Sequence, residues 1–413
     1  MKLRFRPRLR YIPFRKRDIV EMCLASGGLS GTDQMKFRDM CQVLQSIVHF
    51  EYHKKLEILK DSYAPLNPDR DTRKIGVFAD DEDGEFVDGL DELLDKANYE
   101  KLSEEELQMA ITEASLFKLR LHIDFHDFEE VLLYSRGESM RTQEVKSFFG
   151  LRKQQVEFSN YDRVVIYIKF SGKVISRQRR EKPGSTMLKM FQNVPRADVE
   201  MLFPNTRLGM LFIDKLLIGV PALIGGGAIL TTKVGTSLLL LGALVGFWMG
   251  LVSEPVGLDK ITILGLVVGI GGLGSYIWKQ FINFKNRKLA FMQALTESLY
   301  FKNLDNNAGV FHRLIDDAEE EECKEAIVAY YFLSVHPSLE SASQLDETIE
   351  DWFSERWDCQ VDFEVEDALD KLLKLGLVID SGEEQREVMA AVPIDKACEL
   401  LDQIWDGYFT YND

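Results

Sequence analysis

The sequence has few cysteines and no arrangement of them that suits covalent or metal chemistry. Five cysteines are scattered over 413 residues, and no two of them form a CxxC pair. This argues against a disulfide framework or a cysteine-based zinc site and favours a reducing compartment. The first residues also lack the apolar core of a secretory signal peptide, so we expect no such leader.

Each end of the chain has little or no charge of one sign. Residues 2–17 carry eight lysines and arginines and no acid, whereas residues 305–413 carry 29 acids and seven bases. Because nucleic-acid binding needs clustered basic residues, the acidic end argues against a nucleic-acid partner. The basic beginning is compatible either with contact to anionic membrane lipid or with a solvated, partly ordered segment.

No catalytic or cofactor motif stands out. The glycine clusters Gly225–Gly227 and Gly269–Gly274 neither follow a predicted strand nor carry the Lys-Ser/Thr pair of a phosphate loop. Close packing of helices through small residues explains them better, and it makes a homo-oligomer plausible. The spacing also offers no Ser/His/Asp, Cys/His or paired-carboxylate arrangement. We therefore expect no cofactor and assign no catalytic residue.

Three uncharged apolar segments, 216–232, 234–253 and 261–278, are the strongest positive signal. About 20 apolar residues carry a helix across a bilayer, and each segment is at or near that length. They predict a transmembrane block over residues 210–280, between a soluble α+β region (1–204) and an acidic region (281–413). Basic residues on both flanks favour two crossings, with three crossings as the alternative.

On either side of this block the patterns indicate helices and strands. Apolar residues at helical spacing predict a long amphipathic helix over 37–63, which ends at Pro65. Runs of β-branched and aromatic residues predict a small antiparallel sheet from four short strands, at 128–135, 142–148, 154–158 and 163–170. The acidic run Glu319–Glu322 is interpreted as the solvated face of a helix.

The last 90 residues predict three helices, two short strands and a final helix. The expected elements are helices 326–334, 345–356 and 365–375, strands 377–379 and 387–392, and helix 393–405. This is a winged-helix-like order. The third helix carries Asp and Glu where a DNA reader carries Arg and Lys, so contact with a protein partner is expected instead. The predicted fold class is an α+β membrane protein that ends in this winged-helix-like domain.

Six stretches, in order over nearly the whole chain, resemble the transmembrane protein 143-like family. They are Tyr11–Leu24, His49–Asp69, Asp124–Gly137, Leu188–Pro204, Leu299–Leu333 and Phe363–Val378. The resemblance implies an integral membrane protein, either bacterial or in an organelle, with a shared domain of unknown function. It implies no reaction, substrate or cofactor, so no functional residue can be carried over from the family.

Histidines provide the nearest approach to a metal site. His49 and His53 are four residues apart, on one face of the predicted helix. His122, Asp124 and His126 alternate, so on an extended strand all three would point to one side. If the two sets met, they would suit zinc, iron or manganese. The alternative is ordinary histidines in a helix and a strand.

Asp214 and Lys215 lie at the entrance of the first apolar segment. They are candidates for an intramembrane charge pair that serves ion or proton passage, or for a pair at the headgroup boundary with the lysine extended to water. Together the patterns predict a membrane-anchored scaffold that binds a protein partner through its C-terminal region. The alternatives are an oligomeric transporter or channel component and a metal-dependent membrane enzyme. A bacterial inner membrane is the expected location, and a mitochondrial or plastid membrane is the alternative.

Overall fold

The computed structural model describes most of the chain outside the stretch from 210 to 298. The described residues are 8–69, 83–103, 120–147, 152–172, 184–205, 207–209, 247–250, 299–337, 339, 341–380 and 389–409, with isolated residues between 260 and 293. The chain forms two compact units. Unit 1 comprises Met1–Glu113, Phe125–Val199 and Lys302–Asp413, and unit 2 comprises Ala114–Asp124 and Glu200–Phe301.

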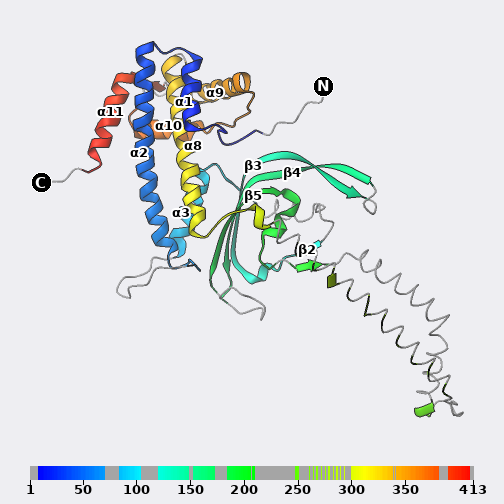
Figure 1. The fold of residues 1–413 in the computed structure, drawn as a ribbon. Coiled ribbons are helices and arrows are strands. Elements are labelled where there is room, and N and C mark those ends of the chain that lie inside the picture. Colours follow the sequence, from blue (N-terminus) through cyan, green and yellow to red (C-terminus); the bar gives the residue numbers. More distant parts are fainter. Residues whose placement is uncertain are drawn as a thin grey trace, which may run out of the picture. The chain divides into compact units, whose positions relative to one another are not determined.

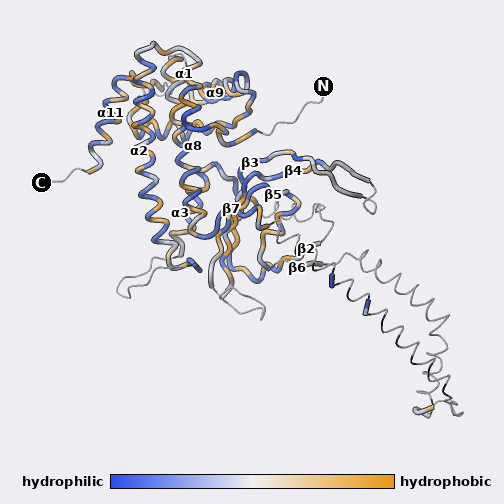
Figure 2. Tube along the Cα trace, in the orientation of Figure 1, coloured by the Kyte–Doolittle hydropathy of each residue, from blue (hydrophilic) through white to orange (hydrophobic). Residues whose placement is uncertain are grey.

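Two long helices form the centre of unit 1. Helix α2 (Gly31–Tyr63) packs beside α8 (Ala308–Val335), as Figure 1 shows. The two run in opposite directions, because Tyr63 at the end of α2 donates a hydrogen bond to Asn307 at the start of α8. Ser30 caps α2 through the Asp33 amide, which moves its start upstream of the predicted residue 37. Along α2 hydrophobic and hydrophilic residues alternate (Figure 2), as one buried face requires.

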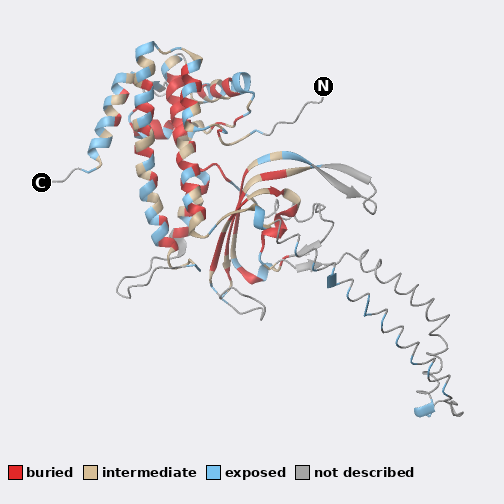
Figure 3. Ribbon diagram, in the orientation of Figure 1, coloured by how far each residue is buried: buried red, intermediate tan, exposed pale blue. Residues whose placement is uncertain are grey.

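Helix α8 is buried on every side over its second half. Residues Ala326 to Leu333 are all buried, and Figure 3 shows the burial concentrated along this helix. A helix that is apolar all round must be enclosed by other elements. Here it is enclosed by α2 and by α1 (Lys16–Ser26), α3 (Asp83–Lys96), α9 (Ala342–Trp357) and α10 (Val365–Lys374).

A five-stranded antiparallel sheet completes unit 1. Its order is β1 (Glu100–Lys101), β3 (Phe128–Ser147), β4 (Arg152–Phe170), β5 (Thr186–Pro195) and β7 (Asn303–Asn306). Instead of four short strands, the chain forms two long ones, β3 and β4. Gly137, with φ of 72°, lies in the gap between two of the expected strands, and β3 runs on through it in register with β4.

The C-terminal elements follow α8 in the order helix, helix, hairpin, helix. After α9 and α10 come β8 (Val378–Asp380), β9 (Met389–Ala391) and α11 (Ile394–Gly407). Gly376, with φ of 69°, ends α10 and turns the chain into β8. The helix expected over 326–334 is the end of the 28-residue α8, so these elements share their core with the N-terminal helices.

The predicted fold class of an α+β membrane protein is corrected by the structure. It is a mixed α+β fold with the antiparallel sheet described above, and within the described residues no helix combines the length and apolarity needed to cross a membrane. The apolar segments 216–232, 234–253 and 261–278 lie mostly outside the described residues. An uncharged run predicts burial of its side chains, but does not by itself specify one unbroken helix. For this reason the apolar segments alone were not enough to establish a membrane fold class.

In unit 2 the structure describes a short two-stranded ladder. Strand β2 (Arg120–His122) pairs with β6 (Arg207–Gly209) in antiparallel register. Asn205 donates a hydrogen bond from Nδ2 to the carbonyl of Asp124 at 2.7 Å, which holds the two segments together beyond the ladder.

Candidate functional site

A row of buried charges on α8 is the most unusual chemical feature of unit 1. Asp317, Glu321 and Lys324 follow one another at helical spacing and are at most 9% exposed. Charged side chains are almost never buried unless they are paired, because leaving water costs several kcal/mol per ion. The partners of this row come from the sheet and from the segment that precedes α1.

Two arginines of the sheet face the acids of α8. Arg136 on β3 contacts Asp317 at 3.2 Å and Glu321 at 2.7 Å, and Arg163 on β4 pairs with Asp317. Arg136 and Arg163 are directly opposite each other across the two strands. Like charges in that position repel each other, and the carboxylate of Asp317, which contacts both arginines, offsets this repulsion.

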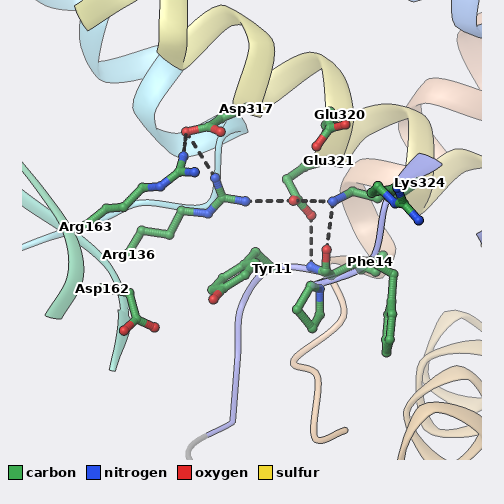
Figure 4. A pocket seen from close by; sticks show the side chains of 12 residues that line it. Tyr11, Phe14, Arg136, Asp162, Arg163, Asp317, Glu320, Glu321 and Lys324 are labelled. Carbon is green, nitrogen blue, oxygen red and sulfur yellow. Dashed lines mark hydrogen bonds and ion pairs between the residues drawn. The ribbon is translucent and has the colours of Figure 1, made fainter. Parts of the chain in front are cut away.

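The N-terminal segment is bound by the same charges. The amide of Ile12 donates to Glu321 at 3.0 Å, and Lys324 donates both to the Ile12 carbonyl and to Glu321, each at 2.7 Å. The ring of Tyr11 lies 4.5 Å from the guanidinium carbon of Arg136, a cation–π contact. Figure 4 shows how helix, sheet and N-terminal segment converge on these side chains.

Burial shifts the proton affinities around the network. Burial, and then the negative charge of Asp317, raise the pKa of Tyr99 to about 12, and its hydroxyl donates to Asp317 at 3.1 Å. One turn beyond Glu321, burial raises the pKa of Glu325 well above its ordinary value, and the charge of Glu321 adds to the shift. Glu325 accepts a hydrogen bond from Asn98 at 2.9 Å.

A cavity of about 230 Å³ opens beside this network. Its walls are the segment Tyr11–Arg15, the two arginines, Asp162 and the charged face of α8. The described residues that line it include no serine, cysteine or histidine, so they offer no Ser-His or Cys-His pair. Its two most buried carboxylates are already paired with cations. The chemistry of the site is therefore that of an ionic junction between three parts of the chain.

The structure places His49 and His53 on an exposed face of α2. His49 contacts Glu319 at 2.7 Å, and Glu319 also pairs with Lys16 at 2.8 Å. Among the described residues, no group of three or more His, Cys, Asp or Glu side chains is placed to hold a metal ion.

The other predicted residues fall on separate elements. His122 ends β2, Asp124 follows it, and His126 is an exposed residue of the short 3₁₀ helix Phe125–Asp127. The strand expected to align the three side chains ends at His122, so the alternation argument does not apply. The side chain of His122, as well as Asp214 and Lys215, lie outside the part of the chain that the structure describes.

Sequence reasoning missed the network because its members are far apart in the chain. The interpretation of Glu319–Glu322 as a solvated face is wrong, since Glu319 and Glu321 are buried. One signal was available. The acidic run continues directly into Ala326–Leu333, an apolar stretch on the same helix, and a helix apolar all round is an enclosed one.

Comparison with known proteins adds a family match but no activity. A family model described as a protein of unknown function (DUF3754) matches residues 161–309. The match covers Arg163, β5 and β7 and ends at the start of α8, so Arg136 and the acids of α8 lie outside it. No solved structure matches the chain. A domain of an uncharacterised family is thus present in this protein.

Proposed function

We propose that the protein is a non-enzymatic scaffold that binds a basic segment of a protein partner on the outer face of α11. The observation that supports this is an exposed stripe of acids beside exposed aromatic rings at the end of that helix and just after it. The narrower resemblance to the transmembrane protein 143-like family stays a prediction and contributes nothing to this proposal.

The acidic stripe has the spacing of one helix face. Its four members are exposed and occur at intervals of four, three and four residues: Asp395, Glu399, Asp402 and Asp406. Lys36 pairs with Asp395, and Lys396 lies 3.1 Å from Glu399. Within the described residues, Asp402 and Asp406 have no cationic partner. The C-terminal half of the stripe therefore carries charge that a partner can neutralise.

Aromatic rings extend the stripe into a binding surface. Trp405 is 45% exposed and Phe409 is 69% exposed. Both rings pack on Phe50 of α2, with centroids 6.5 and 5.3 Å from it. Lys54 lies over the Phe50 ring, 4.6 Å from its centroid, so one ring of this aromatic cluster already holds a cation. Exposed apolar patches rimmed by charge mark interaction sites, and tryptophan is prominent among residues that dominate binding energy.

Charge complementarity supports a basic partner. The chain has a formal net charge of −17, so a basic segment is attracted from a distance as well as at contact. Lysine and arginine satisfy both halves of the surface, because their head groups pair with carboxylates and stack on aromatic faces. A basic amphipathic helix of a partner protein fits this description.

Fluorescence anisotropy with a labelled peptide tests the proposal. The probe is an 18-residue amphipathic helix of Lys, Leu and Ala, and a peptide with Glu in place of Lys is its control. We expect saturable binding that Asp402→Lys/Asp406→Lys weakens about tenfold or more. Trp405→Ala/Phe409→Ala is expected to weaken it similarly, since the rings supply contact area.

A matched charge change on another helix controls for net charge. Glu347→Lys/Asp351→Lys alters two exposed acids, four residues apart on α9, by the same amount. This variant is expected to bind the peptide within about twofold of wild type. Equal losses for the α9 and α11 variants would mean that only the overall charge matters, and the proposal would then be wrong.

A further inference from the structure

Leu9, near the start of the described chain, pairs with a backbone segment of the C-terminal region. Leu9 makes a parallel bridge with Val361. Its amide donates to the carbonyl of Gln360 at 2.9 Å, and its carbonyl accepts from the amide of Asp362 at 2.7 Å. These two bonds on one residue are the smallest unit of strand addition, in which main-chain hydrogen bonds hold a segment and the side chains determine which segment is accepted.

The two arginines beside Leu9 supply the side-chain recognition. Arg8 pairs with Glu350 of α9 and lies 3.0 Å from Asp362. The Nε atom of Arg10 donates to Glu364 at 2.8 Å. In an extended segment, residues two apart point to the same side, so the spacing of the arginines matches that of the acids. We call Glu350, Asp362 and Glu364, with the backbone of 360–362, the acidic slot.

The acidic slot is built more firmly than a chance surface contact. Glu350 also accepts the Phe363 amide at 3.1 Å, which fixes its carboxylate at the end of the slot. Asp346, one turn before it on α9, has an Oδ1 atom that is buried and has no hydrogen-bond partner in the described part of the chain. The carboxylates around Arg8 and Arg10, which include Glu100 at 3.9 Å from Arg10, therefore outnumber the two arginines, and the bound segment leaves part of the negative charge unneutralised.

We propose that the acidic slot is a recognition site for extended protein segments that carry arginine at alternate positions, and that Arg8–Arg10 is its intramolecular occupant. The sequence supports this, because residues 2–10 have lysine or arginine at every second position. A partner segment of the same pattern competes with the chain's own segment for the slot. This inference does not depend on the proposed function of α11, which concerns different residues.

A peptide with the sequence of residues 5–12, labelled for fluorescence anisotropy, tests the slot in the full chain. In the variant Arg8→Glu/Arg10→Glu, the carboxylates of the acidic slot repel residues 8–10 of the same chain, so the slot is open to the peptide. We expect this variant to bind the peptide at least about tenfold more tightly than wild type does, because wild type must first release Arg8–Arg10. Adding Glu350→Lys/Glu364→Lys is expected to abolish the gain, and a peptide with Glu at both arginine positions is expected not to bind.

Hydrogen exchange in wild type and peptide binding by an α11 variant complete the test. If Arg8→Glu/Arg10→Glu does not fold, hydrogen exchange in wild type replaces it. Excess peptide must then raise exchange at the Leu9 amide while the Asp362 amide stays protected. Asp402→Lys/Asp406→Lys is expected to leave peptide binding unchanged. Equal affinity of freed and wild-type slots, unchanged Leu9 exchange, or loss of binding in the α11 variant would each overturn the inference.

Discussion

Helices α8 and α11 carry charged residues at the same spacing in opposite surroundings. On α8 the row Asp317, Glu321 and Lys324 is buried against arginines of the sheet. On α11 the row that ends with Asp402 and Asp406 faces solvent. Helical spacing places residues on one face but does not say what that face meets. In this protein the buried charges are paired inside the fold, and the exposed ones are those that we propose bind a partner.

The largest expected effect is that of breaking the buried network. Arg136→Met keeps most of the side-chain volume but leaves Glu321 and Asp317 short of a cation. Removing one partner of a buried ion pair costs about 3–5 kcal/mol, because the remaining charge stays in the interior. Urea denaturation of the purified protein measures the loss of unfolding free energy.

Arg163→Met is the matched control for this change. Arg163 is about a third exposed, and Asp317 keeps Arg136 when Arg163 is removed. The loss is therefore expected to be clearly smaller than for Arg136→Met. Equal losses, or a loss below about 1 kcal/mol for Arg136→Met, would show that the network contributes less to stability than its burial implies.

A second expected effect depends on pH. Burial raises the pKa of Glu325, so folding favours its protonated form. The stability that this group contributes is present at low pH and is lost as pH rises from the ordinary range of a glutamic acid toward the raised pKa. Glu325→Gln resembles the protonated form and can still accept the hydrogen bond from Asn98. We expect it to be more stable than wild type at pH 7 and equal at pH 4, as measured by denaturation at both values.

The difference between the two helices also explains what the sequence could predict. The ends of the helices expected over 37–63 and 365–375 were predicted, because the signals for an end lie within a few residues of each boundary. The ionic network could not be predicted from the sequence, because Arg136 and Glu321 are 185 residues apart. Glu319–Glu322 was assigned to solvent because an acidic run is usually exposed. What surrounds a charge is decided by the rest of the fold.

The same limit applies to Gly137 and to the histidines. Arg136-Gly137 predicts a turn locally, but pairing with β4 over the whole length of β3 overrides it. His122, Asp124 and His126 alternate only if one strand contains all three, and β2 ends too early. Composition likewise identified three apolar segments without establishing the helices that membrane crossing requires.

A smaller effect is expected at Asp346, beside the acidic slot. Burial, and then the charge of Glu350, raise the pKa of Asp346 to about 6. Its contribution to stability is therefore lost as pH rises through 4 to 6, and at pH 8 its charge opposes folding. Asp346→Asn is expected to raise the melting temperature at pH 8 and to leave it unchanged at pH 4. Because the side chain is only partly buried, solvent screens the effect, which we expect to stay below about 1 kcal/mol.

The smallest effect is expected where the proposed binding surface lies. Asp402→Asn/Asp406→Asn removes two exposed charges that have no cationic partner among the described residues. Such changes usually alter stability by less than about 0.5 kcal/mol, so denaturation curves should overlay those of wild type from pH 5 to 8. A clear loss of stability would mean that these acids, like those of α8, support the fold. The contrast between buried structural charge and exposed binding charge would then fail, because both rows would have the same role.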